Sequence, residues 1–204
     1  MKMTGTDLGS QSWLESANCD GRYGRALGLA LALLLLPCAG GEAARVWMRY
    51  EREGLRHGQL WRLLSAHLVH LSIEHALLNA AALVLLWMLF ARAFTARRWL
   101  WILVGSMAAI DAGFWFLRPA IEWYVGASGV LHGVLAAGAA AACRRGEDLG
   151  ALLLLLLIAK LVYEQQTGLS VFQSSLPILP DAHLFGALGG LLGASLPRLA
   201  RKPL

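Results

Sequence analysis

Charged residues are scarce in this chain. Asp, Glu, Lys and Arg make up 15% of its 204 residues, whereas hydrophobic residues make up 57%. A soluble domain carries about 25% charged and about 45–50% apolar residues, so a soluble protein of this size would have nowhere to bury the surplus. With a mean hydropathy of +0.55, the composition excludes an ordinary soluble domain and predicts apolar surface that faces lipid.

Cysteine is also rare. The three cysteines, Cys19, Cys38 and Cys143, are odd in number and lack CxxC spacing. This pattern predicts neither a disulfide framework nor a zinc site. No other group of side chains has convincing metal-ligand spacing, so we expect no metal and no cofactor.

A cleavable signal peptide is a third absence. The first twenty residues are polar and contain no apolar h-region. We therefore expect the first apolar segment to act as an uncleaved signal anchor. The chain then divides into a polar cytoplasmic segment (1–23), a membrane domain (24–197) and a short basic cytoplasmic tail (198–204).

Apolar runs between the charged residues predict an all-α, polytopic membrane protein with six transmembrane helices. Several runs are shorter than the ~20 residues that cross a ~30 Å hydrocarbon core. We expect loop residues that dip into the membrane to complete these short spans. The six predicted helices are Gly24–Ala44, Ile73–Ala91, Trp99–Leu117, Ser128–Ala142, Leu149–Glu164 and His183–Leu196.

The net charge of +5 comes from small basic clusters between the apolar runs. Such clusters are typical of membrane flanks rather than of a nucleic-acid surface, so we expect a lipid bilayer and no nucleic acid as partner. With the N-terminus inside, eleven Lys and Arg residues lie on the cytoplasmic side and seven on the other. This bias favours cytoplasmic N- and C-termini. The Arg-rich first outer loop, Arg45–His70, is predicted to be an amphipathic interfacial segment whose arginines snorkel.

Four polar residues fall at one depth in this arrangement. Ser128 lies sixteen residues from the cytoplasmic Arg144, His183 fifteen from Arg198, and Asn79 thirteen from Arg92, with His75 one turn further out. At ~1.5 Å per helical residue these separations are ~20–24 Å. Polar side chains inside a membrane are costly and are usually functional. The sequence therefore predicts a polar site just below the outer face of the membrane.

This combination fits acyl-transfer chemistry. A serine becomes nucleophilic when a base lies within hydrogen-bond reach, and His183 could serve as the base of Ser128. The oxyanion of a tetrahedral intermediate needs hydrogen-bond donors. His75 and Asn79, four residues apart on one helical face, could donate, as could the Ser128 amide near a helix N-terminus.

Paired glycines favour the meeting of the fourth and sixth predicted helices. Gly129 and Gly133 form a G-x-x-x-G pattern beside the serine, and Gly186 and Gly190 form another beside the histidine. Small residues at this spacing let two membrane helices approach closely. A Ser–His hydrogen bond requires such an approach.

These residues resemble the motifs of the rhomboid family of intramembrane serine proteases. Gly126-Ala127-Ser128-Gly129 resembles the G-x-S-G motif at the start of the fourth rhomboid helix. Trp61-Arg62 is similar to the W-R motif of the first loop, and His75 with Asn79 to the H-x-x-x-N of the second helix. The segment 182–186 resembles the part of the sixth helix that carries the family's catalytic histidine.

The resemblance implies a six-helix rhomboid bundle with a Ser128–His183 dyad and no carboxylate. His75, Asn79 and the Ser128 amide would form the oxyanion hole, and Gly126 and Ala127 would line the substrate site. Trp61 and Arg62 would anchor the first loop, and Gly129 and Gly186 would support the dyad. The fifth helix and the following loop would gate the substrate.

A narrower resemblance is to the rhombosortase branch of the family. It rests on the compact six-span chain and on the run Gly-Ala-Ser-Gly-Val-Leu-His-Gly at 126–133, in which His132 replaces a more usual aromatic or apolar residue. The resemblance implies membrane-anchored substrates with a C-terminal Gly-Gly motif, an apolar helix and a basic tail. It also implies the inner membrane of a Gram-negative bacterium, with the site open toward the periplasm.

Other polar residues admit more than one interpretation. His132, one turn after Ser128, could stack on His183, hydrogen-bond to it or compete as the base, and a supporting role is favoured. Asp111 could orient an imidazole, but bonding to loop backbone or to first-loop arginines is favoured. We expect Asp181 to cap a helix and Lys160 and Glu164 simply to pair. His67 and His70 are expected to stabilise the first loop.

Two other classes of function were weighed. A non-catalytic rhomboid-like protein would bind client helices, but such relatives usually lack the serine or the histidine, and this chain has both. A small transporter would show an inverted repeat and paired broken helices, which this sequence lacks.

Overall fold

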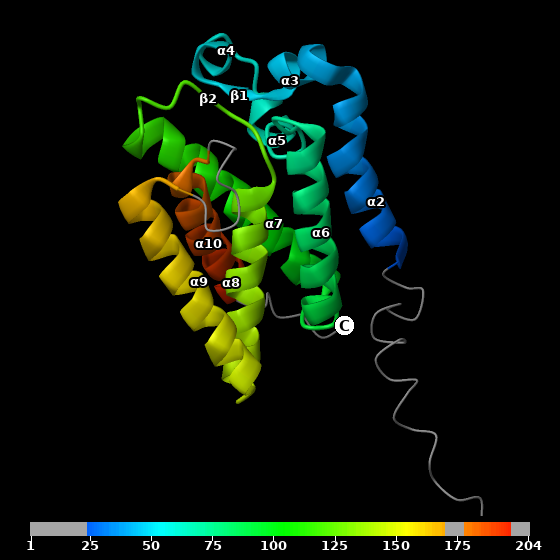
Figure 1. The fold of residues 1–204 in the computed structure, drawn as a ribbon, viewed down its shortest axis with the longest axis vertical. Helices are drawn as coiled ribbons and strands as arrows, with labels where there is room; N and C mark the ends of the chain where they lie inside the picture. The colour runs from blue at the N-terminus through cyan, green and yellow to red at the C-terminus, as the bar shows by residue number, and fades with distance from the viewer. Residues whose placement is uncertain (1–23, 170–177, 197–204) are drawn as a thin grey trace, which may run out of the picture.

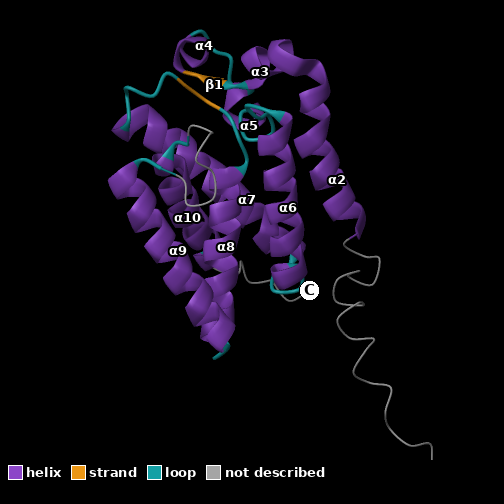
Figure 2. Cartoon of the chain, in the orientation of Figure 1, coloured by secondary structure: helices purple, strands orange, loops and turns teal. Residues whose placement is uncertain are grey.

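The computed structural model describes residues 24–169 and 178–196, and the expected terminal segments 1–23 and 198–204 lie outside them. Within this part the chain consists of helices joined by loops and turns, with one pair of two-residue strands (Figure 2). The elements are α2 (Gly24–Leu35), η2 (Leu36–Gly40), α3 (Gly41–Met48), β1 (Tyr50–Glu51), α4 (Arg52–Arg56), α5 (Arg62–Ser65), α6 (Ile73–Phe90), α7 (Ala96–Ala112), η3 (Gly113–Leu117), β2 (Trp123–Tyr124), α8 (Ser128–Arg144), α9 (Asp148–Thr167) and α10 (Pro180–Ser195).

Six of these helices have twelve or more residues and run side by side (Figure 1). Helix α10 packs against both α7 and α8, α9 packs mainly against α8, and α2 lies on the outside against α6. The strands, α3, α4 and α5 gather at one end of the helices (Figure 1). The bundle therefore has a closely packed centre of α7, α8 and α10 and a looser side at α2 and α6.

Three helical stretches are long and apolar enough to cross a membrane, namely Gly24–Met48, Ile73–Phe90 and Ala96–Leu117. The chain is thus built as an integral membrane protein. Helix α8 is apolar but has 17 residues, α10 has 16, and α9 carries Asp148, Lys160 and Glu164. The expectation of six spans stays a prediction for these three helices.

The predicted first helix, Gly24–Ala44, is not continuous. Helix α2 ends at Leu35, and the chain passes through the 3₁₀ turn η2, which has a proline in its first turn, before α3 begins. Proline lacks a backbone N–H and its ring clashes with the preceding turn, so the α-helical hydrogen bonding cannot run through Pro37.

Glycines bring α8 and α10 into backbone contact. A Cβ on Gly186 would overlap the carbonyl oxygen of Gly129, and a Cβ on Gly190 would overlap that of Gly133. In the same way, a Cβ on Gly129 of α8 would lie 2.6 Å from the oxygen of Ala182 on α10. The close approach expected from the two G-x-x-x-G patterns is present in the structure.

The first outer loop has an apolar exposed face, as expected for an interfacial segment. Trp47 and Trp61 stack with centroids 5.5 Å apart, and both are exposed, as are Leu60 and Leu64. The expectation that its arginines snorkel is wrong for Arg52 and Arg62, which are both 5% exposed.

These two arginines bind backbone carbonyls instead. Arg52 donates to the oxygen of Phe114 at 2.5 Å, at the π-helical turn η3, whose carbonyls lack ordinary α-helical partners. Arg62 donates to the oxygens of Val46 and Arg49 at 2.9 and 2.8 Å. A guanidinium has five donors, so one side chain can satisfy several buried carbonyls at once.

Candidate active site

Ser128 is the first residue of α8, and the short segment before it is tightly fixed. Gly126 has a φ of 122°, a left-handed conformation that suits glycine. Its N–H donates to the oxygen of Ala66 at 2.9 Å, and its own oxygen accepts from the Tyr124 hydroxyl at 2.6 Å. Burial raises the pKa of Tyr124, so this hydroxyl keeps its proton and continues to donate. The predicted site residue Gly126 therefore sets the direction in which the chain enters α8.

Ala127 is held from the side of the first loop. Its N–H donates to Nε2 of His70 at 3.4 Å. Burial, and then the neighbouring His75, lower the pKa of His70 to about 3. His70 is therefore neutral at neutral pH, and its Nε2 can accept. The expected structural role of His70 agrees with this contact.

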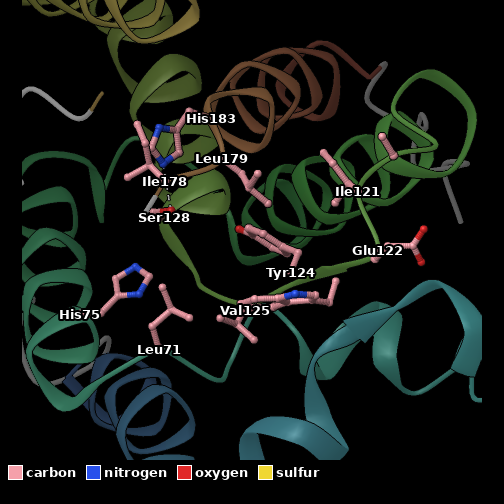
Figure 3. Close-up of a pocket in the computed structure, with 12 residues that line it drawn as sticks. Leu71, His75, Ile121, Glu122, Tyr124, Val125, Ser128, Ile178, Leu179 and His183 are labelled. Carbon is pink, nitrogen blue, oxygen red and sulfur yellow. Dashed lines mark hydrogen bonds between the residues drawn. The ribbon is translucent and has the colours of Figure 1, made fainter. Parts of the chain in front are cut away.

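Ser128 and His183 lie within hydrogen-bond distance, with His183 Nε2 3.0 Å from Ser128 Oγ (Figure 3). His183 is in the first turn of α10 and is buried. The histidine and serine come from the two helices that the glycines bring together. The structure thus brings together the pair that the depth argument singled out.

A carboxylate that was expected only to pair with Lys160 also reaches His183. Glu164 Oε2 of α9 lies 2.7 Å from His183 Nδ1. The expected pairing of Glu164 with Lys160 is present at 2.5 Å, but it uses the other carboxylate oxygen. A fully buried glutamate in an apolar helix is itself a signal of function.

His132 stacks on His183, which is one of the arrangements that its position after Ser128 allowed. The two rings lie 4.1 Å apart at their centroids and 11° from parallel. Nδ1 of His132 lies 2.7 Å from the Ser128 carbonyl oxygen, and Nε2 lies 2.9 Å from Lys160 Nζ. Both nitrogens of His132 are thus engaged with partners other than Ser128 Oγ, and its ring contacts His183 by stacking.

His75, one of the two predicted oxyanion donors, lies across a cavity from Ser128 (Figure 3). This cavity has a volume of about 430 Å³ and is lined by His75, Ser128, His183 and part of the β2 segment, with Glu122 at its edge. Asn79 is buried on α6 and donates one amide hydrogen to the His75 oxygen at 2.9 Å. A second cavity of about 350 Å³ is lined by Asn79, Ser128 and His183 and extends along α6.

The remaining predicted site residues lie outside these cavities. Trp61 and Arg62 lie in the first loop, where Arg62 binds carbonyls. Gly129 and Gly186 lie at the contact between α8 and α10, and Ala127 lies in the turn before Ser128. None of these five residues lines either cavity.

Two acidic residues differ from the favoured expectations. Asp111 lies 3.4 Å from the buried His67 ring and so faces an imidazole, although not that of His183. The expectation that Asp181 caps a helix is wrong, because the N-cap of α10 is Leu179 and Asp181 lies inside the first turn. Its carboxylate accepts from Arg118 at 2.8 Å.

His132, Glu164 and His183 are also close enough to hold a metal ion, since their ligand atoms lie within 4.8 Å of one another. Lys160 Nζ bonds to both His132 and Glu164 within this group. A cation is therefore already supplied by the chain, and a metal would have to displace it. The donor set fits the lysine ammonium better than an added ion.

Comparisons with known proteins point to one family. The Rhomboid domain family matches residues 57–197, which is more than half of the chain. A curated relative from Bacillus subtilis (strain 168), named "Putative rhomboid protease YdcA", is 28% identical over 139 residues, which cover 68% of each chain. No solved structure matches significantly. The chain belongs to the rhomboid family and is a rhomboid-type intramembrane serine protease.

Proposed function

We propose that Ser128 is the nucleophile of this protease and His183 its general base. The observation that carries this assignment is the 3.0 Å separation of His183 Nε2 and Ser128 Oγ beside a cavity. Serine hydroxyls are weak nucleophiles unless a base within hydrogen-bond reach removes the proton. The pair is therefore arranged for acyl transfer.

The proposed reaction begins when Ser128 Oγ attacks the carbonyl carbon of the scissile peptide bond. The Oγ proton passes to His183 Nε2, and the new C–O bond places negative charge on the former carbonyl oxygen. His183 then gives this proton to the departing amine as the C–N bond breaks. Water attacks the acyl-serine and loses a proton to His183. The C–Oγ bond then breaks, His183 returns this proton to Ser128 Oγ, and the product with its new carboxyl end leaves.

Donors for the oxyanion lie on the cavity side of Ser128. The first N–H groups of a helix have no intrahelical partner, so the Ser128 amide at the start of α8 can donate. Asn79 retains one amide hydrogen after bonding to His75, and both residues line the second cavity together with Ser128. Aligned donors of this kind each contribute about 2.7–4 kcal/mol to lowering the barrier.

The substrates we propose are membrane-anchored proteins cut in or next to a transmembrane segment. More narrowly, we propose C-terminal sorting signals with a Gly-Gly motif, an apolar helix and a basic tail. The support is the run 126–133 and its His132, whose ring stacks on the base. We also propose six spans, cytoplasmic termini and a site open to the periplasm of a Gram-negative bacterium.

The test uses the purified full chain and a membrane-anchored substrate that ends in such a signal. We expect Ser128→Ala to abolish cleavage, because no hydroxyl remains to form the acyl-enzyme. A fluorophosphonate probe should label the unmodified chain and not Ser128→Ala. Equal cleavage by the variant, with membrane accumulation unchanged, would refute the assignment.

A paired substrate tests the narrower proposal. Replacement of the Gly-Gly motif by Ala-Ala in the same substrate should lower kcat/KM, whereas the fluorophosphonate reaction, which lacks this sequence, stays the same. Equal kcat/KM for the two substrates would favour a general rhomboid protease over the rhombosortase branch.

A further inference from the structure

We propose that Glu164 is a positioning residue for His183, that Lys160 holds its carboxylate in place, and that His132 bonds to Lys160 and stacks on His183. This inference rests on the assignment of Ser128 and His183 proposed above. In place of a two-residue dyad, three hydrogen-bonded residues then act together: Ser128 on α8, Glu164 on α9 and His183 on α10. The residues were not expected to act together, since Lys160 and Glu164 looked like a pair within one helix.

The two nitrogens of His183 have different partners, which fixes the position of the proton. Nδ1 lies 2.7 Å from Glu164 Oε2. An ionised carboxylate only accepts hydrogen bonds, so Nδ1 must carry the hydrogen. In the neutral ring Nε2 then has a lone pair directed at Ser128 Oγ, 3.0 Å away. This is the tautomer that a general base needs.

The same reasoning fixes His132. Its Nδ1 lies 2.7 Å from the Ser128 carbonyl oxygen, which only accepts, so this nitrogen carries the hydrogen. Its Nε2 lies 2.9 Å from Lys160 Nζ, which only donates. His132 is therefore neutral and bound at both ends. Its stacked ring then holds the plane of His183 from one side.

Glu164 has both carboxylate oxygens engaged. Oε1 accepts from Lys160 at 2.5 Å, and Oε2 accepts from His183. Glu164 is 0% exposed, so an unpaired charge there would be strongly unfavourable, and the ammonium compensates it. If Glu164 served only to neutralise a charge on α9, its bond to Lys160 would be enough. The second bond, which crosses to α10, is the one that acts on the reaction, because it also stabilises the imidazolium formed when Ser128 loses its proton.

The substitution that tests this arrangement is Glu164→Gln, which keeps the shape of the side chain. Lys160 requires an acceptor, so the new amide oxygen should turn to Lys160 and the amide NH₂ to His183 Nδ1. That NH₂ forces the hydrogen of His183 onto Nε2, where it blocks the base. We expect kcat to fall by about 10³–10⁴-fold with little change in KM, as for the loss of an orienting carboxylate in a serine protease triad.

A second substitution separates this effect from a general weakening of the structure. In Glu164→Gln combined with Lys160→Met, no ammonium competes for the amide oxygen, so the amide can rotate and accept from His183 Nδ1. We expect kcat to recover by at least about 10-fold over Glu164→Gln alone, because the correct tautomer is allowed again. A structural role predicts that the double variant is worse than either single one. The matched control is Gln165→Glu, the reverse change on the exposed face of α9, which should leave kcat unchanged.

A spectroscopic measurement needs no change at Glu164. In ¹⁵N-histidine-labelled protein, with the His183 signals assigned by their loss in His183→Ala, we expect Nδ1 protonated and Nε2 unprotonated. The opposite tautomer in the unmodified protein would overturn the proposal.

The outcomes also separate this inference from the proposed function. Full cleavage by Ser128→Ala would remove both. Loss of cleavage in Ser128→Ala with normal kcat in folded Glu164→Gln would remove the positioning role and leave the serine and its base. If Glu164→Gln does not accumulate, the tautomer in the unmodified protein decides.

Discussion

The two sides of Ser128 are built differently. Toward α10 the backbones touch, because Gly129 and Gly133 face Gly186 and Gly190 with no side chain between them. Toward α6 a cavity of about 350 Å³ separates Ser128 from Asn79 and continues along that helix. We call these the closed side and the open side.

The two sides together show how a membrane protein can combine a fixed Ser–His geometry with space for a substrate. On the closed side the backbone sets the distance between the two helices, so the Ser–His separation does not depend on long side chains packing correctly. In a bilayer such contacts are stabilised by van der Waals packing of small residues rather than by the hydrophobic effect. On the open side, space remains in which a substrate segment could lie beside the serine.

The largest expected effect comes from breaking the closed side. In Gly186→Ala the new Cβ would overlap the Gly129 oxygen, so α8 and α10 must separate. We expect a loss of about 3 kcal/mol in the free energy of unfolding, the upper range for overpacking. Cleavage should also be lost, since a 1 Å displacement can cost about 100-fold in rate. Thermal unfolding in detergent and cleavage assays measure the two effects.

Gly28→Ala is the matched control, because Gly28 lies inside α2 and its added Cβ would have nothing within 4 Å. It should leave activity unchanged and stabilise the helix by about 0.4–1 kcal/mol. If Gly186→Ala were as active and as stable as this control, the backbone contact between α8 and α10 would not define the geometry of the site.

The closed side could be predicted from the sequence, because its geometry follows from residue spacing along helices. The depth of Ser128 and His183 follows from counting residues to a charged helix end, and the glycine pattern indicates which helices meet. Local signals also placed the start of α8, which begins at Ser128 as expected. Features encoded along one helix, or in a pair of matching patterns, could therefore be predicted.

Glu164 and Arg52 could not be placed in the same way. Helix α9 is apolar on nearly every face, so periodicity does not indicate which way Glu164 points. Arg52 is buried because it meets carbonyls of η3, more than sixty residues later in the chain. Both depend on contacts between distant segments, which residue type and spacing do not encode. The break at Pro37, in contrast, is encoded locally by the proline, but the continuous apolar run around it predicted one unbroken helix.

A smaller effect is expected in the turn before Ser128, which His70 holds, when pH falls. His70 has its pKa lowered to about 3 by burial, so the folded protein binds its proton less readily than the unfolded chain does. Stability is therefore complete above the unfolded pKa of about 6.5 and declines as pH falls from there toward 3. At pH 5 the loss from His70 alone should be about 2 kcal/mol, since each pKa unit corresponds to about 1.4 kcal/mol.

His70→Gln isolates this contribution. The amide oxygen can still accept from the Ala127 N–H, but the side chain does not titrate. Thermal unfolding of both proteins between pH 5 and pH 8 should show a smaller pH dependence in the variant. Parallel curves for the two proteins would mean that His70 does not remain neutral in the fold, and the turn before Ser128 would then need another explanation.

The smallest effect is expected from narrowing the open side. Ala81 lies on the exposed face of α6 and lines the cavity that reaches Ser128. In Ala81→Leu the larger side chain occupies part of this space without meeting the closed side, so folding should be unaffected. We expect KM for a transmembrane substrate to rise several-fold, on the order of 1 kcal/mol of binding, with kcat nearly unchanged.

Ala81→Ser, which keeps the size of the side chain, should show the KM of the unmodified protein. The small fluorophosphonate probe should label Ala81→Leu at the normal rate, because the new side chain lies away from Ser128 Oγ. A fall in kcat and in labelling with constant KM would show that Ala81 affects the serine itself. The cavity along α6 would then be part of the machinery of Ser128 rather than a path for substrate, and the open side would be as constrained as the closed one.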